Sequence, residues 1–285
     1  MHTSGAKAVT KAINRFANRL SRYDNFADEA DLCQYFTYDS HLSAISREIN
    51  ETYQVSEKAK GNTVFERAVS LMDWLHRELF SVGEHITPLE NNTHAIMGIR
   101  KTGALFCWYQ SIALAEMLIS AGITARVIMC LPEKYDHDTH MAVLVFDHEK
   151  SRWFFMDPTF NTFFASDTKE ALDIFEIRDM YANGELPKFR PIMIDKRWVI
   201  KCCGIECATY DEWYTLYMAK NTFRFMSPAD TFYNCLAGKS PHFVNSSWIA
   251  VNPLNYNHQN EYDREKNITY THCKNAFLHK PSLLK

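Results

Sequence analysis

Three side chains with the chemistry of acyl transfer stand at informative places in the sequence: Cys107, His140 and Asp157. Cys107 lies at the start of the apolar segment 106–121, FCWYQSIALAEMLISA, which predicts a helix that ends at Gly122. A thiol at a helix N-terminus meets unpaired backbone N–H groups and the positive end of the helix dipole, which stabilise its thiolate. The thiolate is the nucleophilic form, and an ion pair with a nearby imidazole would raise its fraction.

His140 and Asp157 are expected to come together through a pair of strands. His140 opens the β-like segment 140–146, HMAVLVF, and Asp157 ends the segment 153–157, WFFMD. The short charged turn between them predicts an antiparallel pair, in which the start of the first strand lies near the end of the second. A buried carboxylate beside the ring would fix its orientation and stabilise the imidazolium, so the order of elements predicts a Cys-His-Asp arrangement.

The surrounding pattern predicts an α+β fold, with the helix that carries Cys107 packed on an antiparallel sheet. A helix is predicted over 63–81, with Thr63 as its cap and Glu66 three residues on. The polar stretch 83–94 is expected to be a loop. Further strands are predicted at 124–130, 244–251 and 267–273, and further helices at 170–182 and 208–226.

We expect one domain over residues 1–285, because the sequence has no repeat and no convincing linker. Its core would span about 63–165, with a helical N-terminal extension over 5–50 and a C-terminal elaboration over 166–285.

The N-terminal segment predicts an amphipathic helix with a basic stripe formed by Lys7, Lys11, Arg15 and Arg19. Its simplest interpretation is the solvated face of a packed helix. The alternatives are a transit peptide and a docking surface for an acidic partner such as a carrier protein, which opposite charges would favour.

Around Cys107, His140 and Asp157 the sequence resembles the transglutaminase-like superfamily of papain-fold cysteine enzymes, in a bacterial-type form. The resemblance covers about 63–165 and rests on separated pieces in the family's order, LFCWYQSIALAEMLISAGITAR, HMAVLVF and RWFFMDPTF. It implies Cys107 as nucleophile, His140 as general base and acid, and Asp157 as the orienting carboxylate. The segment 217–225, YMAKNTFRF, is similar to a downstream segment of bacterial members, and we attach no chemistry to it.

The sequence departs from the family's pattern around the nucleophile. Leu105 stands where a Gly is expected, and no Gln lies at positions 100–106 to help form an oxyanion hole. The donors would be the backbone N–H of Cys107 and a second group, for which Asn91, Asn92, His94 and Trp108 are the candidates. Trp108 could also line the acyl pocket.

Composition excludes several other classes of protein. The 285 residues are 46% hydrophobic and carry a net charge of -3, which argues against disorder and against nucleic acid as the main partner. The sequence has no apolar run of about 18 residues, so no membrane span is expected. No hydrophobic signal segment is visible either, so we expect a cytoplasmic protein. We expect no cofactor, and treat Cys202, Cys203 and Cys207 as ordinary cysteines rather than a zinc site, because they lack paired Cys-x2-Cys spacing.

These observations favour acyl transfer through a thioester, with hydrolysis of an amide or peptide bond as the first hypothesis. The second is amide formation, in which an amine takes the acyl group from an amide or a carrier-protein thioester. The third is an inactive papain-fold scaffold that binds a partner. The sequence does not choose among them, because fold alone does not determine the reaction.

Overall fold

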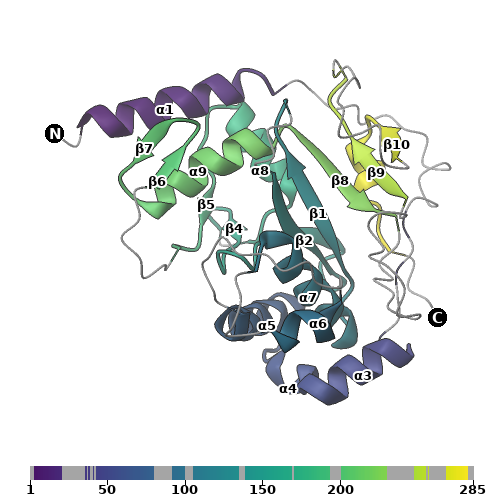
Figure 1. Cartoon of the computed structure of the whole chain (residues 1–285). Helices are drawn as coiled ribbons and strands as arrows, with labels where there is room; N and C mark the ends of the chain where they lie inside the picture. The colour runs from purple at the N-terminus through teal and green to yellow at the C-terminus, as the bar shows by residue number, and fades with distance from the viewer. Residues whose placement is uncertain are drawn as a thin grey trace.

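A computed structural model describes residues 3–20, 36, 38, 41, 43–79, 92–99, 105–134, 139–168, 170–192, 200–229, 247–254, 256 and 268–281. Its centre is a six-stranded sheet in the order β10-β9-β8-β1-β2-β3 (Figure 1). Neighbouring strands are antiparallel except β9 and β10, which are parallel. The strands are β1 (Ala125–Leu131), β2 (His140–Asp147), β3 (Arg152–Met156), β8 (Arg224–Pro228), β9 (Trp248–Val251) and β10 (Ile268–Thr271).

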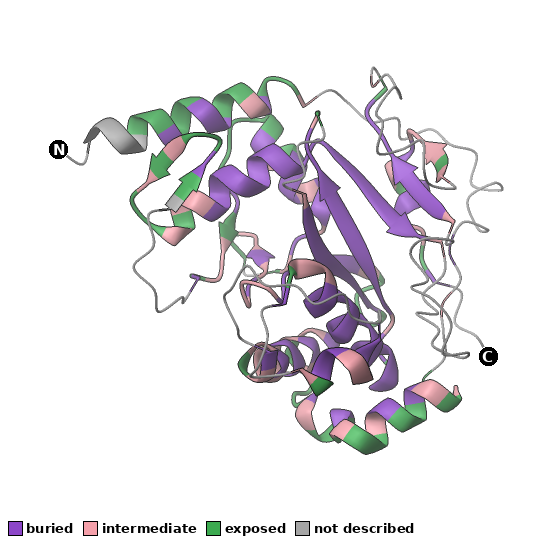
Figure 2. Ribbon diagram, in the orientation of Figure 1, coloured by how far each residue is buried: buried purple, intermediate pink, exposed green. Residues whose placement is uncertain are grey.

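Every residue of β1 and β2 is buried, because both faces of the sheet are covered (Figure 2). Along each strand successive side chains point to opposite faces, so Val143 and Val145 join one hydrophobic cluster while Ala142 and Leu144 join another. The first cluster lies under the helices that precede the sheet in sequence. They are α3 (Ala44–Tyr53), α4 (Val55–Lys58), α5 (Val64–Leu79), α6 (Thr93–Gly98) and α7 (Cys107–Ser120).

The second cluster lies under elements from the two ends of the chain, with α1 packed across α9 and β7. This layer consists of α1 (Thr3–Ala17), α8 (Ile174–Ala182) and α9 (Tyr210–Asn221), with the hairpin β6 (Ile200–Cys202) and β7 (Ile205–Cys207). The short pair β4 (Phe164–Ala165) and β5 (Lys188–Phe189) and the last helix, α11 (Lys274–Phe277), complete the described elements.

The ends of two helices follow from local sequence signals. The hydroxyl of Thr63 accepts a hydrogen bond from the backbone N–H of Glu66, and the Glu66 carboxylate accepts one from the backbone N–H of Thr63, as the capping box predicts. Helix α7 ends at Ser120 with Ala121 as its C-cap, and the next residue is Gly122, whose φ of 77° lies in the left-handed region. The N–H groups of Gly122 and Ile123 then donate to the last turn of the helix, and the chain turns directly into β1.

The predicted fold class is confirmed, and the helix that carries Cys107 packs on β1 and β2 as expected. One prediction was wrong in kind: the helix expected over 208–226 ends at Asn221, and the chain then forms β8 beside β1. The alternating Phe223 and Phe225 suit a strand as well as a helix, and pairing with β1 decides between them.

Smaller differences concern boundaries. Thr93 and His94 belong to α6 rather than to a loop, and residues 83–91 of that expected loop lie outside the described part. Helix α8 starts at Ile174 instead of 170, because Asp173 caps it. Of the strands expected at 244–251 and 267–273, the structure shows β9 and β10, while residues 244–246 and 267 lie outside the described part. The division into one domain with two extensions stays a prediction. Within the described helices, none is long and apolar enough to cross a bilayer.

Gly122→Ala is expected to lower the free energy of unfolding by about 1 kcal/mol, because a Cβ is disfavoured at positive φ. The added methyl group would meet only His41 at ordinary contact distance, so the cost is one of backbone conformation. Urea unfolding measures it. Gly98→Ala is the matched control, since its Cβ would meet nothing within 4 Å and no positive φ is involved. Equal losses for the two variants would contradict this account of the helix end.

Candidate functional site

The central contact of the site is the pair formed by His140 and Asp157 at one end of the sheet. His140 Nε2 lies 2.5 Å from Asp157 Oδ2, and both side chains are at most 1% exposed. His140 is the first residue of β2, and Asp157 directly follows β3. The β2–β3 register places the two side chains diagonally on the same face of the sheet. A buried carboxylate paired in this way orients the ring and favours its protonated form.

The turn after β3 fixes the carboxylate of Asp157. Its Oδ1 atom accepts hydrogen bonds from the backbone N–H groups of Thr159 (3.0 Å) and Phe160 (3.4 Å). Such local acceptance by an Asp side chain is the usual stabilisation of a turn. The backbone N–H of Asp157 donates to Thr162, and Thr162 donates back, which closes the turn. Oδ2 is thereby left facing His140.

A second set of contacts holds this turn from outside. The Arg190 guanidinium donates a hydrogen bond to the backbone oxygen of Asn161. It also forms an ion pair with Asp73 of α5, at 2.7 Å. From the same helix, His76 Nδ1 lies 2.9 Å from the carbonyl oxygen of Pro158. Burial lowers the pKa of His76, although the Pro158 hydrogen bond and the charge of Asp157 act in the opposite direction. A neutral ring that donates to Pro158 suits a structural role.

Cys107 is the first residue of α7 and is half-buried. Its side chain lies beside the His140 imidazole and helps to raise the pKa of that ring. Because Nε2 faces Asp157, Nδ1 is the ring nitrogen left for the thiol. The N-cap residue Phe106 makes no side-chain capping hydrogen bond, and the first N–H groups of a helix have no intrahelical acceptor. The helix therefore presents backbone donors next to the sulfur.

The environment favours the imidazolium form of His140. Burial alone would lower the pKa of the ring, but the charge and hydrogen bond of Asp157, together with the Cys107 side chain, raise it to about 10. The ring therefore carries a proton that it can hold towards a negative charge beside it.

Helix α9 contributes residues to the site that the sequence analysis missed. Tyr214 OH donates to Asp157 Oδ2 at 2.8 Å, and the Tyr217 ring meets the His140 ring edge-on at a centroid distance of 5.3 Å. Trp213 stacks on Tyr217, and Phe160 packs between Trp213 and Tyr214. The aromatic spacing in YDEWYTLY was a usable signal, because residues three and four apart share a helix face.

Residues 50–158 match the family model of the transglutaminase-like superfamily. This segment is therefore similar to the core of that superfamily. This confirms the resemblance drawn from the sequence, whereas the bacterial-type assignment stays a prediction. Comparison with curated proteins gave no match, and comparison with solved structures gave none. Transglutaminase-like domains are in general cysteine enzymes of acyl transfer or hydrolysis, and the match ends one residue after Asp157.

The residues predicted for the oxyanion hole or the substrate pocket lie at different distances from Cys107. Trp108 follows Cys107 and is half-buried, with its ring centroid 6.3 Å from that of Trp248. Asn92 instead caps α6 through a hydrogen bond from the backbone N–H of Ala95, and the next residue, Thr93, donates to Glu116 of α7. Glu116 lies about 13 Å along that helix from its first residue.

His94 belongs to the same distant end, where its Nδ1 atom lies 3.1 Å from Tyr53 OH and its Nε2 atom lies 3.6 Å from Glu48. We therefore leave Asn92 and His94 out of the proposed site. Asn91 lies outside the described residues.

The other cysteines differ from Cys107 in their surroundings. Cys130 pairs with His140 across β1 and β2, but it is fully buried, and burial raises the pKa of its thiol well above the ordinary value. Cys202, Cys203 and Cys207 lie on the β6–β7 hairpin, where the first two sulfurs are 3.6 Å apart. Among the described residues, no group of three or more potential ligands is arranged to hold a metal ion.

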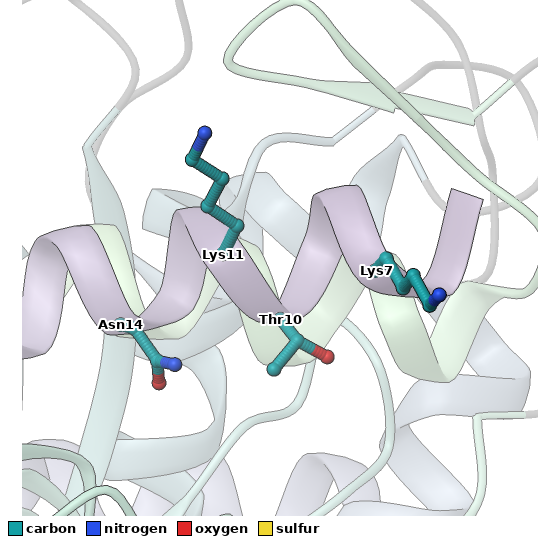
Figure 3. Close-up of a pocket in the computed structure, with 4 residues that line it drawn as sticks. All are labelled: Lys7, Thr10, Lys11 and Asn14. Carbon is teal, nitrogen blue, oxygen red and sulfur yellow. The ribbon is translucent and has the colours of Figure 1, made fainter. Parts of the chain in front are cut away.

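The basic stripe of α1 is exposed, and the opposite face of that helix is buried, as its pattern predicts. A hollow of about 420 Å³ lies along the exposed side, lined by Lys7, Thr10, Lys11 and Asn14 (Figure 3). Lys11 extends away from Thr10 and Asn14 in that view. None of these four residues belongs to the candidate site. Docking of an acidic carrier protein on this stripe stays a prediction.

Asp157→Asn is expected to destabilise the protein by about 3 kcal/mol near pH 6.5, because it leaves His140 buried without its charge partner. The pKa of His140 is raised in the folded state, so its contribution is complete below about pH 6.5 and disappears as the pH rises through about 10. The difference in unfolding free energy between wild type and variant should therefore shrink over that interval.

Urea unfolding at several pH values between 6.5 and 10 measures this difference. Asp167→Asn is the control, because Asp167 is exposed and pairs only with Lys188 among the described residues. Its profile should follow that of the wild type. A constant difference between wild type and Asp157→Asn over the interval would contradict the ion pair.

Proposed function

We propose that the protein is a cysteine-dependent acyl-transfer enzyme that forms a thioester at Cys107 and hydrolyses an amide or peptide bond. The observation that carries this proposal is the buried pair of His140 and Asp157, with the Cys107 side chain beside the same ring. The transglutaminase-like core over residues 50–158 supports the same class of chemistry.

In the first half-reaction the Cys107 thiolate attacks the carbonyl carbon of the substrate. The carbonyl π electrons move to oxygen, and a tetrahedral intermediate forms. When it collapses, the C–N bond breaks, and the His140 imidazolium gives its proton to the leaving nitrogen. Asp157 holds the ring so that this proton faces the substrate side. The products are a Cys107 thioester and a free amine.

In the second half-reaction water resolves the thioester. The now neutral His140 takes a proton from water, and the oxygen attacks the thioester carbonyl. The C–S bond breaks, the sulfur leaves as the Cys107 thiolate, and His140 is again an imidazolium. The sum is one amide and one water converted into one carboxylic acid and one amine.

The start of α7 supplies the oxyanion stabilisation. The backbone N–H of Cys107 lies next to the sulfur, and the aligned peptide dipoles add positive potential there. Trp108, the next residue, is our candidate for the wall of the acyl pocket. We assign no second oxyanion donor.

Exposure at the nucleophile favours water over a dedicated amine acceptor. Cys107 is only half-buried, and the preceding Phe106 is 47% exposed, so solvent reaches the thioester. Amide formation needs an acceptor site that excludes water. Hydrolysis is therefore our first assignment, and transfer to an amine is the outcome against which it is tested.

Limiting iodoacetamide at pH 5.5, followed by intact mass, should label Cys107 about a hundredfold faster than an ordinary exposed thiol, because a free thiol is almost wholly protonated there. The adduct should disappear in Cys107→Ala and form at least tenfold more slowly in His140→Ala. Cys203→Ala is the matched control, since Cys203 is exposed and remote from His140 in the fold.

Slow labelling that is spread over several cysteines and unchanged in His140→Ala would refute an activated nucleophile. The inactive scaffold would then be the better interpretation.

An aryl thioester of a short peptide, offered with and without a primary amine, tests the fate of the acyl group. We expect the free acid as the main product by mass spectrometry, with formation lost in Cys107→Ala. If the amide predominates even at modest amine concentration, the protein is an amide-forming acyltransferase and the hydrolytic assignment is wrong.

A further inference from the structure

Helix α9 lies beyond the segment that matches the family core, yet it reaches the candidate site. Tyr214 OH donates a hydrogen bond of 2.8 Å to Asp157 Oδ2, the oxygen that also lies 2.5 Å from His140 Nε2. Oδ1 of the same carboxylate accepts from the backbone N–H groups of Thr159 and Phe160. The Asp157 carboxylate therefore has four donors, two on each oxygen, and three of the four are independent of His140.

The position of Tyr214 is fixed by its packing. Its ring is fully buried and lies against the rings of Phe160, Phe164 and Phe189, at centroid distances of 5.2, 5.7 and 5.1 Å. Burial, together with the nearby Asp157 charge, raises the pKa of Tyr214 well above its usual value. The Tyr214 hydroxyl thus stays protonated at neutral pH and acts as a hydrogen-bond donor.

A carboxylate can rotate about its Cβ–Cγ bond, and one of the two Oδ1 contacts, from Phe160, is long at 3.4 Å, which leaves some of this freedom. A rigid donor on Oδ2 removes it and holds that oxygen in line with His140 Nε2. Hydrogen bonds to charged groups contribute about 1.5–3 kcal/mol, enough to determine the orientation of one side chain.

We propose that Tyr214 is a positioning residue, which aligns the Asp157 carboxylate on His140 and so completes the site from outside the family core. The proposal rests on the proposed function for its catalytic meaning. Its physical content, an effect of one hydroxyl group on His140 through Asp157, can be tested whether or not Cys107 is a nucleophile.

The first measurement is the titration of His140 followed by NMR of its ring in Tyr214→Phe. A misaligned carboxylate holds the ring proton less well, so the midpoint should fall by about one pH unit. A rise of the His140 midpoint would have a different cause. If the Tyr214 hydroxyl only withdrew charge from Asp157, loss of that hydroxyl would strengthen the ion pair between Asp157 and His140 and raise the midpoint. A rise, or no change, overturns the proposal.

Tyr181→Phe is the matched control. Tyr181 is also a fully buried tyrosine, and its hydroxyl donates to the backbone oxygen of Thr215 in the same helix α9. Loss of this hydroxyl weakens the packing of α9 but removes no hydrogen bond to Cys107, His140 or Asp157. We expect an unchanged His140 midpoint, and equal shifts in the two variants would refute a specific role for Tyr214.

The pathway of the effect is tested in the Asp157→Asn background. If Tyr214 acts through Asp157, adding Tyr214→Phe to Asp157→Asn should not move the His140 midpoint further, whereas independent effects would add. A further shift of similar size in the double variant would overturn the proposal.

Alkylation of Cys107 connects this inference with the proposed function. At pH 5.5 we expect labelling of Tyr214→Phe to be about tenfold slower than that of wild type, and labelling of Tyr181→Phe to be unchanged. If wild-type Cys107 reacts like an ordinary thiol, the proposed function fails, and the His140 titrations still decide whether Tyr214 positions Asp157. If Cys107 is fast and equally so in Tyr214→Phe, the positioning role fails by itself.

Discussion

Burying an imidazolium and a carboxylate at the end of a sheet is costly unless each has its partners, and the pair of His140 and Asp157 satisfies this condition with elements from distant parts of the chain. The ring comes from the first residue of β2, and the carboxylate comes from the turn after β3. The α5 helix and Arg190 hold that turn, and α9 supplies a hydroxyl. Much of the architecture around the sheet end can be understood as the surroundings that this one charged contact requires.

The sheet itself provides the rigidity. β1 and β2 are buried on both faces, so the position of His140 is determined by packing on two sides at once. One layer carries Cys107 at the start of α7, and the other carries Tyr214 on α9. The candidate site lies where both layers meet the same end of the sheet. A sulfur, a ring and a carboxylate can therefore be held in contact although each belongs to a different element.

Local signals in the sequence were sufficient for the core. The Thr63 capping box, the Gly122 helix end and the alternation in β2 predicted elements that the structure contains, and strand order alone brought His140 near Asp157. Long-range pairing was beyond such signals: nothing local tells that 224–228 pairs with β1 or that Tyr214 reaches Asp157. Asn92 and His94 were misjudged for a related reason, because closeness in sequence to Cys107 does not show which end of α7 they contact.

The pairing of β8 with β1 has a consequence for synthesis on the ribosome. The strand β1 ends at Leu131, but its partner on that side begins only at Arg224. At about 5–20 residues per second, several seconds pass during which a hydrophobic strand has emerged with one row of backbone N–H and C=O groups unpaired. Such an edge can pair with other chains, so the nascent protein is expected to need a chaperone, or a low local concentration of its own copies, until β8 has been made.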